Sequence, residues 1–384
     1  LNPENDDIYY NLGIAYLNTN RLVQAMDAFN RSVKLNFENG KAHYNLGIIL
    51  ESILKTDKAI QSYKVAKKYS PDITDINYRL GMLLYKNEEF YESMEPLREY
   101  IIHNPDSISV LKVLGDIFIN ETRFQESINV YERLILLYPF DHKYLINLSY
   151  SHYKLGNIEK AYDNYKKVLE YNDEDADIYK IIGEIAFELR DYKSAIFYLK
   201  EAINCGSYNF ETLYSLGISY ASLGKYMQAL IALEELQNFS SENNEIFFQK
   251  GIIYYELELY EYAIENFIKF SSIVNDDALV YVLIGKSFMN LKKYQNAITS
   301  FGESMKINSQ DYRTLFFIGE AYYNLNNYSE SAKSFRKALK INPDDAQSHH
   351  GLGLCYFHLN KTRSMKKELN ILKMLDPILY DSLQ

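Results

Sequence analysis

The chain has 384 residues, 47% of them hydrophobic and 24% charged, which is the composition of a folded chain rather than a disordered one. Its formal net charge of −10 argues against general binding to nucleic acid or to anionic membranes, because both need a basic surface. No apolar run approaches the roughly 18 residues of a membrane span, and no signal-peptide pattern opens the chain. We therefore expect no nucleic-acid partner and no direct insertion into a membrane.

The first five residues match a later part of the chain. Leu1 to Asn5 read L-N-P-E-N, and residues 340–344 read K-I-N-P-D. We interpret residues 1–5 as the tail of a preceding repeat. Because the chain does not begin with methionine, we also expect further residues upstream of it.

A small residue recurs every 34 positions along the chain, with no insertion anywhere. It is serine once and glycine ten times: Gly13, Gly47, Gly81, Gly115, Ser149, Gly183, Gly217, Gly251, Gly285, Gly319 and Gly353. With this residue numbered position 8, the chain divides into eleven units, which begin at residues 6, 40, 74, 108, 142, 176, 210, 244, 278, 312 and 346. Such an array is expected to form one quasi-linear body whose length follows the number of repeats.

Each unit holds two amphipathic helix patterns around a short polar turn. In the unit that spans Asp311 to Asp345, apolar residues recur at spacings of three and four on both sides of the turn at Asn324 to Asn327. Position 20 is small in ten of the eleven units, and position 24 is always large and apolar or aromatic. Small residues at positions 8 and 20 let the paired helices approach closely, and the large residue at 24 fills the adjoining gap. One such pair cannot bury both of its apolar faces, so it needs neighbours.

Proline marks the end of several units. Six of the seven prolines fall at position 32, where a proline ends the second helix of a pair: Pro3, Pro71, Pro105, Pro139, Pro343 and Pro377. Pro96 instead falls inside a second helix, where we expect a local kink or a late helix start rather than a functional hinge.

This pattern resembles the tetratricopeptide repeat, in which a large residue, Leu-Gly and Tyr in the first helix precede Ala, a bulky residue and Pro in the second. The resemblance covers residues 6–379 and leaves 380–384 as a short C-terminal tail. It implies an all-α fold, a right-handed superhelical solenoid of about eleven helix-turn-helix repeats. It also implies a concave groove lined by the first helices, which in this family commonly binds peptides or partner proteins.

The sequence contains no catalytic constellation. It has no phosphate-binding glycine-rich loop, no nucleophile elbow and no H-E-x-x-H or C-x-x-C motif, so we expect neither an enzyme nor a cofactor. The densest set of potential metal ligands is His349, His350, Cys355 and His358, but only His350 and His358 lie roughly on one helix face. We interpret the four as packed or solvated side chains and expect no metal.

The spacing of the two cysteines is informative about the cellular compartment of the protein. Cys205 and Cys355 lie almost five repeats apart, too far for a disulfide in an extended array. Unpaired cysteines fit a cytoplasmic location, and a periplasmic one stays open.

If the family geometry holds, positions 2, 5, 6, 9, 12 and 13 of each first helix face the groove. Aromatic rings there suit the recognition of a partner, and the candidates are Tyr44, Tyr78, Tyr214, Phe248 and Tyr255. The alternative is that these rings mainly pad the contact with the next repeat.

The same positions of the sixth to eighth units are acidic, with only Lys180 in opposition: Asp177, Glu184, Glu188, Glu211, Glu245 and Glu256. Such a surface would favour a basic segment of a partner and raise its rate of association. The alternative is a solvated face of an already acidic protein.

One known groove signature is absent. The carboxylate clamp of heat-shock co-chaperones fits best as Lys112, Asp116, Asn147, Asp177 and Ile181, and three of these five residues are of the wrong type. Binding of chaperone carboxylates by this clamp is therefore not expected.

Taken together, these patterns lead us to interpret the chain as a non-enzymatic scaffold that binds a protein or peptide in its groove. Two alternatives are the substrate-recruiting region of a larger enzyme, such as a glycosyltransferase whose catalytic domain lies outside this chain, and an array that self-associates through its ends.

Overall fold

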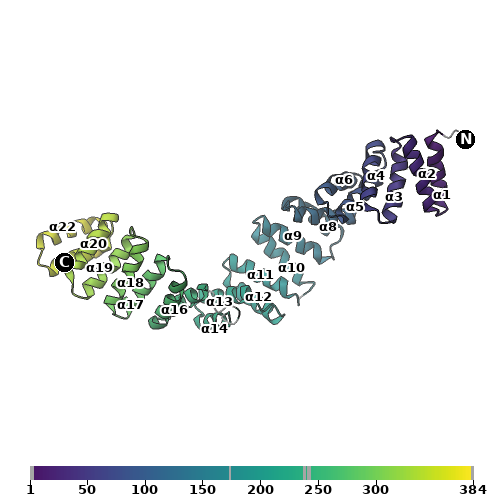
Figure 1. The fold of residues 1–384 in the computed structure, drawn as a ribbon. Helices are drawn as coiled ribbons and strands as arrows, with labels where there is room; N and C mark the ends of the chain where they lie inside the picture. Colours follow the sequence, from purple (N-terminus) through teal and green to yellow (C-terminus); the bar gives the residue numbers. More distant parts are fainter. Residues whose placement is uncertain (1–3, 173, 237–238, 240–243, 382–384) are drawn as a thin grey trace. The chain divides into compact units, whose positions relative to one another are not determined.

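In the computed structural model, which describes residues 4–172, 174–236, 239 and 244–381, the chain forms 23 helices and no strand. Figure 1 labels most of them. The first helices of the pairs, here called A helices, are α1 (Asp6–Asn18), α3 (Gly40–Ser52), α5 (Thr74–Lys86), α7 (Ile108–Asn120), α9 (His142–Lys154), α11 (Ala176–Glu188), α13 (Phe210–Ser222), α15 (Asn244–Glu256), α17 (Ala278–Asn290), α19 (Tyr312–Asn324) and α21 (Ala346–His358).

The second helices, here called B helices, are α2 (Leu22–Leu35), α4 (Thr56–Tyr69), α6 (Phe90–His103), α8 (Phe124–Leu137), α10 (Ile158–Leu169), α12 (Tyr192–Asn204), α14 (Tyr226–Leu236), α16 (Tyr260–Ile273), α18 (Tyr294–Ile307), α20 (Tyr328–Ile341) and α22 (Thr362–Leu375). The short α23 (Pro377–Asp381) follows the last pair and contacts α22 and α21. It includes Tyr380 and Asp381 of the expected C-terminal tail; residues 382–384, like 1–3, lie outside the described residues.

The A helices begin at the residues where the 34-residue units begin. Eight of them follow an Asn or Asp whose side-chain oxygen accepts a hydrogen bond from a backbone N–H of the first turn, which satisfies a donor that has no partner within the helix. These residues are Asn5, Asn39, Asp141, Asp175, Asn209, Asp277, Asp311 and Asp345. Five B helices end two residues before a proline of position 32, as predicted, at Pro71, Pro105, Pro139, Pro343 and Pro377.

Every A helix ends in the same left-handed turn. The residue at position 15 has a positive φ in all eleven repeats, although it is glycine only at Gly156 and Gly224. In every repeat the N–H of position 16 donates to the carbonyl of position 11, as Arg21 does to Tyr16 at 2.9 Å. This is the Schellman geometry, which turns the chain sharply into the B helix. The sequence did not reveal it, because nine of the eleven residues carry a side chain.

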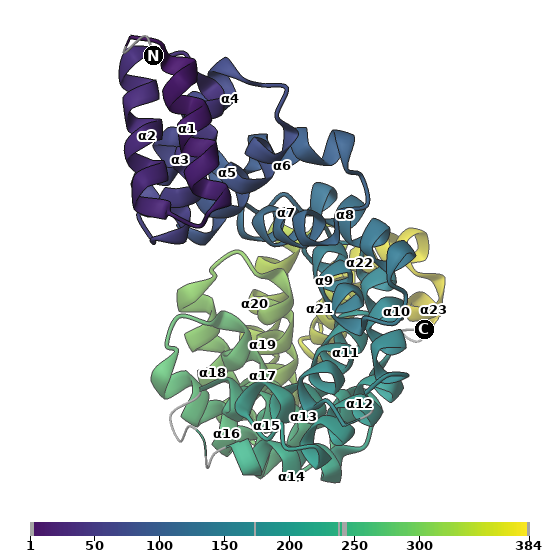
Figure 2. The same ribbon diagram turned by 90° about the vertical axis from the view of Figure 1, so that its right-hand side faces the viewer.

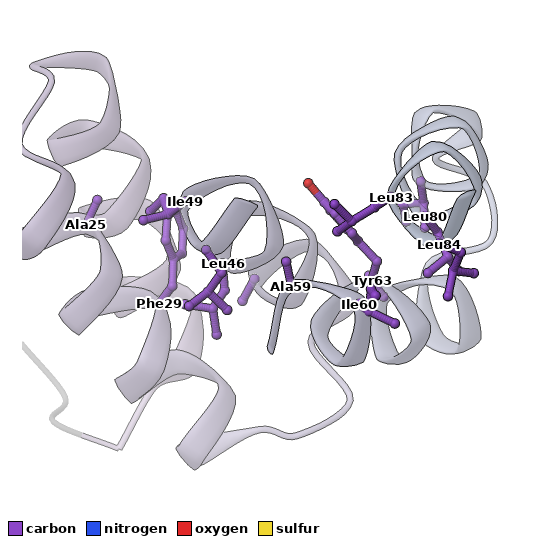
Figure 3. Close-up of a cluster of buried hydrophobic side chains, with 14 residues drawn as sticks. Ala25, Phe29, Leu46, Ile49, Ala59, Ile60, Tyr63, Leu80, Leu83 and Leu84 are labelled. Atoms are coloured by element: carbon purple, nitrogen blue, oxygen red, sulfur yellow. The ribbon is translucent and has the colours of Figure 1, made fainter. Parts of the chain in front are cut away.

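The close approach predicted for positions 8 and 24 is confirmed. A Cβ atom built on Gly285 would lie 2.4 Å from Cε1 of Phe301, and one on Gly47 would lie 2.5 Å from Cε1 of Tyr63. Figure 3 shows this core in the first unit, where Phe29 and Tyr63 lie among aliphatic side chains of α3, α4 and α5. Glycine at position 8 is therefore the residue that lets a large ring sit between the paired helices.

The serine that replaces glycine in the fifth repeat is accommodated by a local hydrogen bond. Ser149 is fully buried, and its hydroxyl donates to the carbonyl of Leu145 one turn earlier in α9. A serine hydroxyl can form this bond without a partner elsewhere, so burying it leaves no polar group unsatisfied.

The expectation of a late helix start at Pro96 is wrong. Helix α6 begins at Phe90, the same repeat position as its neighbours, and Pro96 lies buried inside it. The proline removes one N–H from the helix, but six preceding residues already hold the helical conformation before it. The start is fixed by the turn at Glu88, whose φ is 62°, rather than by the proline.

The described chain divides into two compact units, Leu1–Ile178 and Tyr179–Gln384, with the boundary inside α11. From α1 to α10 and from α12 to α23 each helix packs on the next, and some A helices also contact the following A helix, as α5 does α7 and α17 does α19. Figure 2 shows α17, α19 and α21 of the second unit side by side. The predicted all-α repeat architecture is confirmed.

Candidate functional site

Side chains of consecutive A helices meet on one surface in each unit. In the first unit the hydroxyl of Tyr44, at position 5, donates to Asp75 Oδ2, at position 2 of the next repeat, at 2.5 Å. In the second unit Tyr214 and Glu245 form the corresponding pair at 3.4 Å. Positions 2 and 5, with the positions one or two turns further along each helix, therefore share a surface. We call positions 2, 5, 6, 9, 12 and 13 of the A helices the A-helix face.

The candidate aromatic residues are all half-buried, and most of them pack on the B helix of their own repeat. The ring centroids of Tyr78 and Tyr100 lie 5.2 Å apart, and those of Phe248 and Phe270 lie 5.1 Å apart. Tyr44 lies 6.2 Å from Tyr63 in the same way. One side of each ring is thus used for packing within the repeat, and the other side remains on the A-helix face.

Two further aromatic candidates take part in hydrogen bonds between repeats. Tyr255 accepts a bond of 3.4 Å from the side-chain amide of Asn290 in the next A helix. Burial and the charge of Glu245 raise the pKa of Tyr214 to about 12, so this hydroxyl keeps its proton and serves as a donor. The hydroxyl groups of Tyr214 and Tyr255 therefore link consecutive repeats, and their rings lie on the A-helix face.

Acidic side chains of α11 and α13 lie close enough to affect one another. Burial raises the pKa of Glu184, and the neighbouring carboxylates of Glu211 and Glu188 add to the rise. Lys180 opposes the rise, and its Nζ lies 3.7 Å from Glu184 Oε1. This part of the A-helix face therefore has an excess of negative charge.

The remaining acidic candidates differ in their surroundings. Glu211 and Glu256 are exposed, whereas Glu245 is half-buried and accepts a 2.8 Å bond from the Gln249 amide. Asp177 is exposed at the start of α11 and falls within the first unit, so we do not group it with the residues of the second.

Sequence reasoning missed a second acidic position in the second unit. A cavity of about 360 Å³ is lined by Phe316, Glu320 and Tyr323 of α19, by Gln347 and His350 of α21, and by Leu379 of α23. Burial raises the pKa of Glu320, and Lys286 opposes the rise. The signal in the sequence is a glutamate at position 9, the position that Glu184 occupies in its own repeat.

Sequence reasoning also missed a network that neutralises part of the A-helix face in the first unit. Arg79 Nε donates to Asp75 at 2.7 Å, and its Nη1 donates to Glu51 at 3.4 Å. Glu51 also accepts a 2.6 Å bond from the hydroxyl of Tyr63. Because the cation and both carboxylates are engaged with one another, Tyr44 and these residues hold repeats two and three together.

The absence of a carboxylate clamp has a structural counterpart. Asp116 accepts a 2.8 Å bond from the Tyr131 hydroxyl, which in turn accepts one of 2.8 Å from the Asn147 amide. Two residues of the best trial register, Asp116 and Asn147, are therefore tied to a core tyrosine.

The histidines near the C-terminus have separate structural partners. His349 is buried, with Nδ1 2.6 Å from Glu368 Oε2 and Nε2 2.9 Å from the carbonyl of Pro343. His358 stacks on Tyr328 at 4.2 Å, and Cys355 is buried with its Sγ 3.0 Å from the Ser331 hydroxyl. In the described part of the chain no three His, Cys, Asp or Glu side chains are grouped so as to hold a metal ion.

Over the same residues, no helix has both the length and the apolar character needed to cross a membrane.

The fold and the repeated surface define an α-helical repeat protein. Models of the tetratricopeptide repeat match residues 6–39, 146–210 and 278–311, and a TPR repeat model matches residues 319–360. The chain belongs to the tetratricopeptide repeat family. Repeats of this family suggest a protein–protein interaction scaffold, and its members are typically not enzymes.

Solved structures place the chain among similar repeat proteins. The C-terminal part of a TPR repeat-containing protein from Cytophaga hutchinsonii is 14% identical, covers 62% of this chain and 99% of its own, and has a TM-score of 0.55. The structure of Naa15/Naa10 bound to HypK-THB is 13% identical over 97% of this chain, with a TM-score of 0.48, and this chain spans 64% of that one. YrrB, described as a TPR protein with an unusual peptide-binding site, is 20% identical over 48% of this chain and 96% of its own, with a TM-score of 0.43. No curated protein sequence matches the chain.

Proposed function

We propose that the chain is a scaffold that binds a basic segment of a partner protein on the A-helix face of the second unit. The observation that carries the proposal is the grouping of Glu184, Glu188 and Glu211 on this face beside the single lysine Lys180, and burial with these like charges raises the pKa of Glu184. A group held in its charged form beside like charges is destabilising on its own, and a cationic ligand relieves the repulsion. Lysine and arginine side chains of a partner would supply that charge.

The aromatic residues of the same face support the proposal. Tyr214, Phe248 and Tyr255 lie on helices α13 and α15, within three residues of Glu211, Glu245 and Glu256 respectively. A half-buried ring offers apolar contact at low entropy cost, and its face attracts a cation. A partner segment that alternates basic and apolar residues would use both kinds of contact.

The test compares two variants that carry the same change of charge. The face variant replaces acidic residues of the A helices, with Glu184→Gln, Glu188→Gln, Glu211→Gln and Glu256→Gln. The control variant replaces acidic residues of the B helices in the same unit, with Glu201→Gln, Glu234→Gln, Glu261→Gln and Glu265→Gln. The ligand is a fluorophore-labelled peptide of alternating lysine and leucine, and its fluorescence anisotropy reports binding.

We expect the face variant to bind the peptide about tenfold more weakly or worse, and the control variant to bind it within about twofold of the parent. Binding by the parent should also weaken as salt is added, because the charges lie at the surface. Equal weakening in both variants would show that only the net charge of the protein acts, and the proposal would then be wrong.

A further inference from the structure

A second surface of opposite charge lies on the B helices of the first unit. A pocket of about 690 Å³ is formed by α2, α3 and α4, with apolar side chains on its floor, among them Met26, Leu46 and Leu50. Three lysines line it, and no Asp or Glu is among the described side chains that do so. We call this the B-helix pocket.

The lysines of the B-helix pocket carry uncompensated charge. Lys55 precedes α4, and Lys58 and Lys64 lie on that helix; all three are exposed. Within the described chain none of them has a carboxylate within 4.0 Å. The side chains that α2 and α3 contribute to the pocket carry no formal charge while His43 is neutral. The pocket is therefore a local positive region on a protein whose net charge is −10.

One buried polar atom in this pocket lacks a partner. His43 lines the pocket and is 6% exposed, and its Nε2 lies 3.1 Å from the carbonyl of Phe37. Because a carbonyl only accepts, Nε2 carries the proton. The other ring nitrogen, Nδ1, is buried and has no hydrogen-bond partner. A buried polar atom without a partner is rare and points to a missing one.

The last repeat shows what that partner is. His349 occupies the same repeat position as His43, and its Nε2 bonds to the carbonyl of position 32 in the same way. Its Nδ1, however, meets the carboxylate of Glu368 at 2.6 Å. Glu368 stands at position 23, where the second repeat has Ser62, a residue that lines the B-helix pocket. The second repeat thus lacks the carboxylate that its counterpart contains.

We propose that the B-helix pocket binds a carboxylate of an acidic segment of a partner protein. The carboxylate occupies, at His43 Nδ1, the place that Glu368 occupies at His349. The three lysines attract further acidic residues of the segment, and the apolar floor takes an adjacent apolar side chain. This site is separate from the A-helix face and does not depend on the function proposed for it.

Binding of a carboxylate at Nδ1 takes up a proton. Burial lowers the pKa of His43, which favours the neutral ring with a lone pair on Nδ1 in the free protein. A carboxylate there favours protonation of Nδ1, while the proton on Nε2 stays hydrogen-bonded to the carbonyl of Phe37. The three lysines, the only charged groups among the described side chains that line the pocket, oppose that proton until the carboxylate arrives. Binding should therefore be tighter at about pH 6 than at about pH 8, a range in which peptide carboxylates and lysines hardly change their charge.

The first test uses the full chain labelled with ¹³C-histidine and the peptide acetyl-Leu-Glu-Leu-Glu-amide. The NMR signal of His43, assigned by its loss in His43→Gln, should shift on titration and saturate. The glutamine analogue of the peptide should cause no such shift. The variant with Lys55→Gln, Lys58→Gln and Lys64→Gln should bind at least about tenfold more weakly, whereas Lys34→Gln, Lys41→Gln and Lys143→Gln together should bind like the parent.

The decisive variant is Ser62→Glu, which introduces the missing carboxylate and leaves every lysine in place. We expect it to be folded, to show the His43 shift without peptide, and to lose peptide binding at least about tenfold. Peptide binding that is unchanged in Ser62→Glu would overturn the proposal. So would an equal His43 shift with inorganic phosphate at the same concentration, because the pocket would then attract any anion. Because neither of these results uses His43→Gln, a folding defect in that variant does not affect the conclusion.

Discussion

At the scale of single residues, glycine at position 8 is required by the ring that lies on it. Phe301 is fully buried, and a methyl group on Gly285 would come within 2.4 Å of it. Contacts this short force a side chain out of its rotamer or push the helices apart. Gly302, only one residue beyond Phe301, has no atom within 4 Å of the place where its Cβ would be.

These two glycines give a matched pair of predictions. Gly285→Ala should lower the free energy of unfolding by about 1–3 kcal/mol, because the ring has no space to move into. Gly302→Ala should raise it by about 0.5–1 kcal/mol, because alanine has the higher helix propensity and meets no atom. Urea denaturation followed by circular dichroism measures both. A gain in stability from Gly285→Ala would contradict the packing described for position 8.

The buried histidines show why part of the candidate site could not be predicted from the sequence. His349 packs in the core, but its contact with Glu368 depends on a side chain one helix away. The unpartnered nitrogen of His43 appears only when that contact is compared with the second repeat. By contrast, the acidic excess around Glu184 follows from helix positions alone, because residues three or four apart share a face.

At the scale of the helices and turns, the A helices could be predicted from the sequence to the residue. The 34-residue spacing has no insertion, so one well-marked start determines the others, and capping Asn or Asp residues stand before most of them. The left-handed turns could not be predicted in the same way. Thr122, Arg190 and Lys292 are not residues that favour a positive φ, and they adopt it because the helices on both sides are held by their packing.

The turn residues give a second matched pair. Thr122 has a φ of 57°, and replacement by glycine should raise the free energy of unfolding by about 1 kcal/mol, because a β-branched residue is strained there. Gly156 has a φ of 78° and no atom within 4 Å of its Cβ position, so Gly156→Ala should lower it by about 1 kcal/mol through the backbone alone. Thermal unfolding by calorimetry measures both. If neither variant changes stability, the turns are not held in the left-handed conformation.

At the scale of the whole molecule, the repeat is the unit that can be removed. Deletion of residues 278–311 joins Asp277 to Tyr312, so that α19 takes the place of α17 against α16. Adjacent repeats present the same kind of surface to each other, and stability in such arrays is close to a sum of repeat and interface contributions. We expect a folded chain that loses helix in proportion to its length and melts cooperatively.

Deletion of residues 278–293 is the control. It removes α17 and its turn but leaves α18, so the B helix α16 is followed directly by another B helix. Phe267, fully buried in the intact chain, would lose the A helix that covers it. We expect this shorter deletion to be the more damaging, with an early, broad melt or aggregation. Circular dichroism and light scattering compare the two, and equal stability would show that the helix pair is not the structural unit.

The left-handed turns also provide labelling sites that are spaced by whole repeats. Position 15 is exposed in all eleven repeats, and in the nine repeats where it is not glycine its side chain lies in solvent. Cys355 is buried, and once the exposed Cys205 is replaced by serine no other thiol competes for a label. Dyes on Asn20→Cys and Glu88→Cys would then report, by energy transfer, the rise over two repeats of the first unit. A change in that distance when the acidic peptide is added would show how far occupancy of the B-helix pocket stretches or compresses the array.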